Sequence, residues 1–200
     1  MTAHSLRARF KATVTEAILD AAEELAAEVG VPATNLQAVA KRAGVSVGTI
    51  YNHFEDRSEL FAELFARRKQ ELLNALDSAS KKTATARYDA QLDSYVSTVL
   101  TFFDTRRTFL RLAMEGHAPK PPVRKAGATQ ESMEQLTIRA QRVVRVGVKE
   151  KRIRADIADL APYFLTAALR AVLIAHVHAP KPLAGETARV IELFSKGTSR

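Results

Sequence analysis

The sequence predicts an all-α fold of about nine helices: an N-terminal three-helix domain containing a helix-turn-helix, and a C-terminal helical domain. Apolar residues recur every three or four positions in almost every segment, which indicates helices with one buried face. Only 8 of the 200 residues are glycine and 7 are proline, so long unbroken helices are expected. No run shows the clear apolar–polar alternation of a half-buried strand. With 46% apolar residues, the chain can form a substantial core.

Residue spacing and end signals set the bounds of these helices. A capping box of Thr13 and Glu16 predicts the start of the first helix, and Gly30 predicts its end. One face of that helix carries the apolar residues Val14, Ile18, Ala21, Leu25 and Val29. The expected helices cover residues 14–29, 36–43, 47–54, 57–79, 88–104, 105–117, 129–151, 157–178 and 183–196. The proline-rich stretch 118–128 is the clearest predicted loop.

Composition and motifs exclude several classes of protein. There is no cysteine, so disulfide scaffolds and thiolate metal sites are ruled out. No apolar stretch approaches the ~20 residues that cross a bilayer, and the first ten residues lack the apolar core of a signal peptide. We therefore expect a cytoplasmic protein without a membrane partner. No Gly-rich phosphate loop, GxSxG or HExxH motif occurs. We expect no catalytic residue, no cofactor and no metal site; His176 and His178 point about 200° apart on a helix and cannot share an ion.

The net charge of +8 favours a polyanionic partner such as nucleic acid. Its distribution is uneven, because residues 1–60 hold 6 basic and 8 acidic residues (a net of −2), whereas residues 61–200 hold 24 and 14 (a net of +10). DNA binding by the first third must then depend on locally placed charge. An N-terminal arm, residues 1–12, supplies Arg7, Arg9 and Lys11. The acids Glu16, Asp20, Glu23, Glu24 and Glu28 are expected on the solvent side of the first helix.

The stretch from residue 35 to 54 has the pattern of a helix-turn-helix. Gly44 can adopt the positive φ that turns the chain between two short helices, whose N-caps are Asn35 and Ser46. Ile50 and Phe54 face inward, which leaves the other side of the second helix for a major groove. Tyr51 and Arg57 are expected to reach phosphates. The predicted DNA-binding residues are Asn35, Gln37, Ser46, Val47, Gly48, Thr49, Tyr51, Asn52, His53 and Arg57.

Residues 18–22, 38–46 and 48–54, followed by Arg57 and Leu60, resemble the N-terminal domain of the TetR family of bacterial transcriptional regulators. The family usually has threonine where this chain has Asn35, and it more often has lysine at the position of Arg57. The resemblance implies a homodimer that represses transcription from a palindromic operator. It also implies a C-terminal domain that binds a small-molecule effector and thereby releases the DNA.

We expect the domains to divide at residue 57, with the helix-turn-helix domain at 1–57 and a ligand-binding and dimerisation domain at 58–200. The helix at 57–79 is then the lever between them. The apolar helices at 157–178 and 183–196 would form a four-helix dimer interface. Candidate ligand-binding residues, which core packing would explain as well, are Tyr95, Phe102, Phe103, Arg106, Phe109, Met114, His117 and Tyr163.

An alternative function is a DNA-binding regulator that is constitutive or controlled by a partner protein, without a small ligand. A cavity distinguishes the two hypotheses. An enclosed pocket within residues 88–178 would favour control by an effector, whereas a solid core would favour the alternative. The identity of the effector and the sequence of the double-stranded operator lie beyond what these residues specify.

Overall fold

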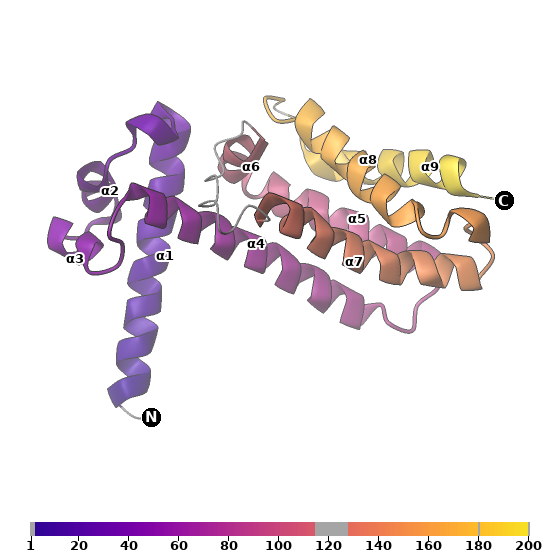
Figure 1. Cartoon of the computed structure of the whole chain (residues 1–200), viewed down its shortest axis with the longest axis horizontal. Helices are drawn as coiled ribbons and strands as arrows, with labels where there is room; N and C mark the ends of the chain where they lie inside the picture. Colours follow the sequence, from indigo (N-terminus) through magenta and orange to yellow (C-terminus); the bar gives the residue numbers. More distant parts are fainter. Residues whose placement is uncertain (1–2, 115–127, 180, 200) are drawn as a thin grey trace. The chain divides into compact units, whose positions relative to one another are not determined.

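The computed structural model describes residues 3–114, 128–179 and 181–199, with the side chains of residues 9–114, 134–179 and 181–199. The described part is helical throughout (Figure 1). Its α-helices are α1 (Ala3–Val29), α2 (Leu36–Ala43), α3 (Val47–Tyr51), α4 (Arg57–Lys82), α5 (Tyr88–Asp104), α6 (Arg107–Met114), α7 (Ala128–Lys149), α8 (Ala161–Ala175) and α9 (Thr187–Thr198). Within the same described residues, three short 3₁₀ turns, η1 (Val31–Ala33), η3 (Ala155–Ile157) and η4 (Leu183–Glu186), lie between helices. The predicted all-α class is confirmed.

The chain forms two compact units. The described part of the first unit comprises residues 3–68 and 111–114, and that of the second comprises residues 69–110, 128–179 and 181–199. The division falls inside α4, eleven residues after the boundary expected at 57. Consequently α4 contributes its first half to one core and its second half to the other.

The first unit is built on a core that α1, α2, α3, α4 and the end of α6 share. Its fully buried side chains are Ile18, Leu19, Val39, Ile50, Leu60 and Leu64, each with essentially no exposed surface. Each buried aliphatic side chain of this size stabilises the fold by about 1.5–3 kcal/mol relative to an exposed one. The core therefore holds α2 and α3 in a fixed orientation on α1.

The second unit is organised around α5, which packs against α7, α8, α9 and η4. Leu92, Val96, Val99 and Leu100 of α5 are buried. The Tyr88 ring of α5 packs directly on Gly147 of α7, where a Cβ would lie 2.7 Å from the ring. Burial raises the pKa of the Tyr88 hydroxyl to about 12.

Two predicted helices, 36–43 and 88–104, are confirmed to the residue, and other bounds differ for identifiable reasons. The first helix starts at Ala3, not after an arm of twelve residues, since no glycine or proline interrupts residues 3–29. The predicted capping box is wrong: Thr13 and Thr15 lie inside α1 and donate to the carbonyls of Arg9 and Lys11. Val29, expected on the buried face, is half exposed.

Later bounds shift by a turn. The second helix of the helix-turn-helix ends at Tyr51, where Asn52 turns the chain, and not at Phe54. The helices expected at 157–178 and 183–196 each begin with a 3₁₀ turn, so α8 spans Ala161–Ala175 and α9 spans Thr187–Thr198. The expected loop at 118–128, apart from Ala128, and the candidate residue His117 lie outside the described residues. Among the helices that the structure describes, none has both the length and the apolar character needed to cross a bilayer.

Candidate nucleic-acid interface

Two side-chain caps and one glycine set the angle between α2 and α3. Asn35 Oδ1 accepts the backbone N–H of Ala38 at 2.8 Å, and Ser46 Oγ accepts that of Thr49 at 3.0 Å. Gly44 ends α2 in the left-handed region, with φ at 68° and its N–H directed to the last carbonyls of the helix. Both capping side chains are thus engaged within the protein, while the unpaired N–H groups at each helix start suit an anion.

The outer face of α3 is exposed, as the sequence predicted, whereas Ile50 on the inner face is fully buried. Val47 is 40% exposed and Tyr51 is 52% exposed. Gly48 and Asn52 are exposed beside them, and Thr49 is half-buried with its hydroxyl 2.8 Å from that of Ser46. The exposed members form what we call the α3 face: Val47, Gly48, Tyr51 and Asn52.

Gly48 has no structural role that requires a glycine. Its φ is ordinary, and a Cβ there would meet only Ser46 Oγ, at 3.8 Å, which is normal van der Waals contact. Yet a glycine inside a helix costs about 1 kcal/mol relative to alanine. The surface over Gly48 is therefore left open at the centre of the α3 face.

Arg57 stands at the start of α4, and its guanidinium donates to the carbonyl of Pro32 between α1 and α2. The same helix start carries a D-x-x-E cap, in which Asp56 Oδ1 accepts the N–H of Glu59 at 2.8 Å. Arg57 remains exposed, as does Gln37 on α2. Contact of these two residues with phosphates stays a prediction. One guanidinium nitrogen of Arg57 is already engaged by the Pro32 carbonyl.

His53 lies against α1, contrary to the expectation that it faces outward. Its Nδ1 is 3.0 Å from the hydroxyl of Thr15. That hydroxyl donates its single proton to the carbonyl of Lys11, so it accepts from Nδ1–H, and the neutral ring has its lone pair at Nε2. Burial, with a smaller contribution from the positive charge of Lys11, lowers the pKa of His53. No local sequence signal could reveal a contact between residues 38 positions apart.

Arginines neutralise the acids of α1, which the sequence placed on the solvent side. Buried Arg68 of α4 binds Glu23 at 2.9 Å, Glu16 at 3.4 Å and also Asp20. Arg42 of α2 forms a bidentate pair with Glu28 at 2.5 and 2.7 Å. The acidic excess of the first third is therefore locally compensated on α1 and does not oppose a polyanion at α3.

A family model supports this interpretation of the first unit. Residues 18–64 match the model described as "Bacterial regulatory proteins, tetR family". These residues contain the whole α2–turn–α3 arrangement and the α4 cap. These residues are therefore a DNA-binding domain of the TetR-family type.

Curated relatives match the N-terminal part of this chain. The fatty acid metabolism regulator protein of Bacillus subtilis (strain 168) is 34% identical over 70 residues, which are 35% of this chain and 36% of the relative. The HTH-type transcriptional regulator AcrR of Shigella flexneri is 50% identical over 48 residues, 24% of this chain and 22% of the relative. The matched segments thus span about a third or less of these two relatives, which are named as regulators and not as enzymes.

Solved structures extend the likeness to the whole fold. FadR from Bacillus subtilis, in complex with stearoyl-CoA, aligns with a TM-score of 0.78 at 19% identity, covering 91% of this chain and 98% of that one. SmeT in complex with triclosan aligns with a TM-score of 0.75 at 21% identity, covering 94% and 92%. At such identities the comparison establishes the fold, which is that of TetR-family regulators.

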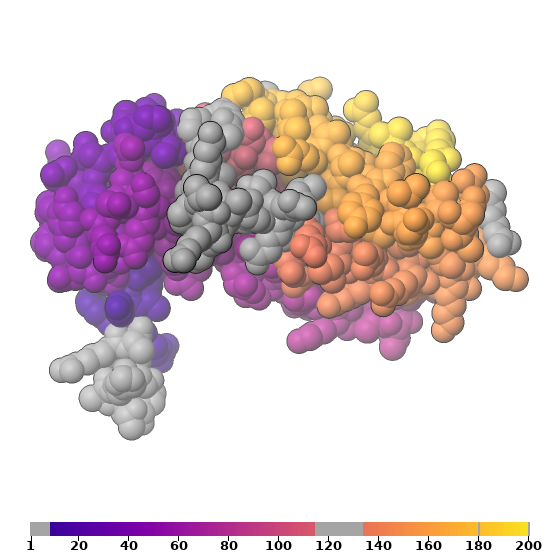
Figure 2. Space-filling model, viewed as in Figure 1, coloured from indigo at the N-terminus to yellow at the C-terminus, as the bar shows by residue number. Residues whose placement is uncertain are grey.

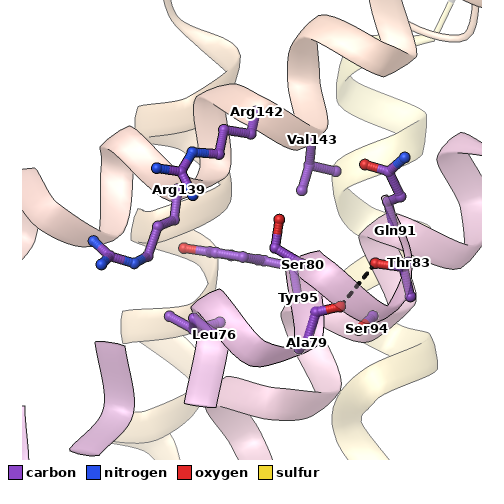
Figure 3. Close-up of a pocket in the computed structure, with 10 residues that line it drawn as sticks. All are labelled: Leu76, Ala79, Ser80, Thr83, Gln91, Ser94, Tyr95, Arg139, Arg142 and Val143. Atoms are coloured by element: carbon purple, nitrogen blue, oxygen red, sulfur yellow. Dashed lines mark hydrogen bonds between the residues drawn. The ribbon is translucent and has the colours of Figure 1, made fainter. Parts of the chain in front are cut away.

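The second unit of the chain has a small hollow between α4, α5 and α7 (Figure 3). Its cavity volume is about 20 Å³, room for little more than a water molecule, and it opens to solvent. Its lining residues are Leu76, Ala79, Ser80, Thr83, Gln91, Ser94, Tyr95, Arg139, Arg142 and Val143. Tyr95 lies across it, and its hydroxyl donates to the carbonyl of Leu136 at 3.1 Å. Burial raises the pKa of this phenol.

The hollow carries an excess of positive charge. Arg139 binds Asp77 in a bidentate pair at 2.7 and 3.1 Å, and Arg142 reaches the same carboxylate at 3.3 Å. Two guanidinium groups thus share one carboxylate, and they hold the pKa of Asp77 below its usual value. Arg139 and Arg142 are not among the residues predicted from the sequence, because their contacts with Asp77 join residues 62 and 65 positions apart.

The residues predicted to bind a ligand do not come together at this hollow, which includes only Tyr95. Phe102, Phe103 and Phe109 pack on one another in the core, with Phe103 and Phe109 stacked at 6.2 Å. Arg106 lies 4.7 Å above the Phe102 ring and pairs with Glu71 at 2.8 Å. Met114 is half-buried in the first unit. Tyr163, 61% exposed on α8, lies on the surface of the second unit.

Proposed function

We propose that this chain is a dimeric transcriptional repressor that binds a palindromic operator through α3 and is released by a small-molecule effector. The observation that carries the proposal is the α3 face, in particular Gly48. An exposed helical glycine without an internal reason allows the backbone to approach a duplex closely. Val47 is placed to contact a thymine methyl group, and Asn52 offers both a donor and an acceptor to base edges. A regulator of this kind acts in the cytoplasm.

An exposed apolar stripe on α8 supports the proposed dimer. Leu160, Phe164 and Ile174 are large and exposed, and with Ala167 and Ala171 between them they recur at spacings of four and three, which is one helical face. Leu193 of α9 is also exposed, at 54%. The small residues allow a second copy to pack closely. One short recognition helix makes few base contacts, so two copies are needed for useful specificity.

The effector site that we propose is the hollow between α4, α5 and α7. Its charge excess favours an amphipathic ligand with an anionic group that binds Arg142 and competes with Asp77 for Arg139. One neighbour of the same fold is consistent with this class, since FadR was solved with stearoyl-CoA, whereas SmeT was solved with triclosan, a small apolar phenol. The hollow is small in this structure, so a ligand of that size would have to displace α4 or α7.

The alternative, regulation without a small ligand, is favoured by one observation. The aromatic residues expected to line a pocket pack on one another instead. Thermal-shift screening distinguishes the two hypotheses, because a ligand that binds only the folded state raises the Tm. We expect fatty acyl-CoA or a long-chain fatty acid to raise the Tm and to release operator DNA. Arg142→Ala should abolish both effects, while Arg145→Ala on the same helix should retain them. A panel of such anions that leaves the Tm unchanged would favour the alternative.

Operator binding is tested by selecting bound sequences from a random duplex library and measuring their affinity. We expect a palindromic motif with half-sites about one helical turn apart. Gly48→Ala is the sharpest variant. It should raise the free energy of unfolding by about 0.5–1 kcal/mol, because alanine favours the helix, and yet weaken operator binding at least tenfold. Retained affinity in Gly48→Ala, or a library without an enriched motif, would refute the proposed role of α3.

A further inference from the structure

The N-terminal part of the described chain forms a structure different from the flexible arm that the sequence suggested. Residues 3–13, which we call the basic extension, are the first three turns of α1, and they precede the first core residues of that helix. Figure 1 shows α1 continuing past α2 and α3 toward the N-terminus, and the indigo part of Figure 2 shows the first unit from the same side. Arg9, Phe10 and Lys11 are exposed, Phe10 by 72%.

The basic extension carries uncompensated positive charge. The first acid of the chain is Glu16, so residues 1–15 contain Arg7, Arg9 and Lys11 and no carboxylate side chain. Among the described residues, neither Arg9 nor Lys11 takes part in an ion pair, in contrast to Arg42, Arg67 and Arg68 of the same unit. This arrangement is explained most simply by an anionic partner.

The contact between Thr15 and His53 fixes where this charge lies. Because His53 follows α3 directly and its ring meets α1 at Thr15, the basic extension leaves the unit beside the end of α3. Lys11, one turn earlier on α1, is close enough for its charge to act on His53. From Thr15 to Ala3 the helix rises by about 18 Å, which is the length of about five base pairs of duplex.

We propose that the basic extension binds the phosphate backbone of the DNA that flanks each operator half-site. The inference rests on the proposed function, since it takes α3 to lie in the groove. With α3 there, the extension continues as a rigid helix from the edge of the reading site. Arg9 and Lys11, two positions apart, point to opposite sides of this helix, so each would reach a different run of phosphates, which carry no sequence information. It adds affinity and salt dependence, not base specificity. A flexible arm would lose more conformational entropy on binding than this preformed helix.

The exposed Phe10 between two cations also suits an anionic lipid surface. The described side chains of the extension include only this one large exposed apolar group, whereas an interfacial helix needs a broad apolar face. The position beside α3 therefore favours DNA over a membrane, and lipid binding becomes an outcome of the test.

The experiment compares wild type with the double variant Arg9→Ala/Lys11→Ala. A matched control, Lys81→Ala/Lys82→Ala, removes the same charge from exposed positions at the end of α4 in the second unit. Affinity for the selected operator is measured over a range of salt concentrations. We expect the slope of log K against log salt to fall by about 0.9 for each phosphate that is no longer neutralised, and thus by about 1.8 per bound chain in the double variant only. Unchanged circular dichroism melts show that all three proteins are folded.

A second measurement uses operators of two lengths, one ending at the half-sites and one extended by about five base pairs on each side. Wild type and the Lys81/Lys82 control should bind the longer duplex more tightly, whereas the double variant should not distinguish the two. Specific binding with the same slope and the same length dependence in all three proteins would overturn the inference and leave the proposed function intact. Absence of specific binding by wild type itself would refute the proposed function. Loss of binding to anionic vesicles without any change in DNA binding would assign the extension to a lipid surface.

Discussion

Arg68 Nε donates a hydrogen bond of 2.9 Å to Glu23, and both side chains are almost completely withdrawn from solvent, at 5% and 10% exposure. The pair joins α4 to α1 inside the first unit, close to the residue at which α4 passes into the second unit. Asp20 and Glu16 complete the surroundings of the guanidinium. The first half of α4 is therefore fixed to α1 by charge as well as by apolar packing.

Removing Arg68 should be strongly destabilising, because it leaves the Glu23 carboxylate buried without its partner. We expect Arg68→Ala to lower the free energy of unfolding by about 3–5 kcal/mol. Arg152→Ala provides the comparison, since Arg152 pairs with Asp89 at 2.8 Å on the surface and should cost less than about 1 kcal/mol. Urea titration measures both. Equal effects of the two substitutions would contradict the structural importance of the buried cluster.

The turn between α2 and α3 depends on one glycine. A side chain at Gly44 would meet nothing within 4 Å, but its φ of 68° is strained for any residue with a Cβ. Gly44→Ala should therefore cost about 1–2 kcal/mol through backbone conformation alone. Gly185→Ala, where space is equally open and φ is ordinary, should be neutral or slightly stabilising. If chemical denaturation finds the two variants equally stable, backbone strain is not what selects glycine at the turn.

His53 makes the stability of the first unit depend on pH. Its pKa is lower in the folded state, so between that value and the unfolded value of about 6.5 the unfolded chain binds more protons. The contribution of His53 to the free energy of unfolding is complete above this window. It is lost as the pH falls through the window, with no further loss below the folded pKa. The ring faces Thr15 and the cation of Lys11.

The pH effect is isolated by comparing wild type with His53→Gln. Denaturation at about pH 7.5 and about pH 5.5 should show a larger loss for wild type, while Lys11→Ala should reduce that loss. Other titrating groups contribute equally to all three proteins and cancel in the comparison. A wild type that loses no more stability than His53→Gln would show that the imidazole is equally solvated in both states.

The apolar stripe on α8 predicts the effect of a charge placed within it. Ile174→Glu should convert a dimer into monomers, because an unpaired carboxylate cannot be buried in the interface. Operator affinity should fall with it, since each half-site then binds separately. Thr101→Glu, at an exposed position of α5, adds the same charge away from the stripe and should remain dimeric. Light scattering after size exclusion gives the mass directly. A dimer that survives Ile174→Glu would exclude this face.

The sequence alone determined the α2–turn–α3 arrangement. Asn35, Gly44 and Ser46 act on neighbours within about one helical turn, so local chemistry specifies where each helix starts and stops. The spacing of Ile50 among exposed residues likewise determined which side of α3 faces outward. The class of fold followed from helical periodicity, which is a short-range property of the chain.

Only the tertiary structure decided which charges and rings meet. The contacts of Arg68 with Glu23, of His53 with Thr15 and of Arg139 with Asp77 join residues 45, 38 and 62 positions apart. Their partners depend on how the helices pack, and no periodicity within a helix carries that information. For the same reason the sequence identified the aromatic residues of the C-terminal part, but it could not show whether each lies in the core or lines a pocket. It also suggested an arm at residues 1–12, although continuity with the packed part of α1 makes residues 3–12 a rigid helix beside α3.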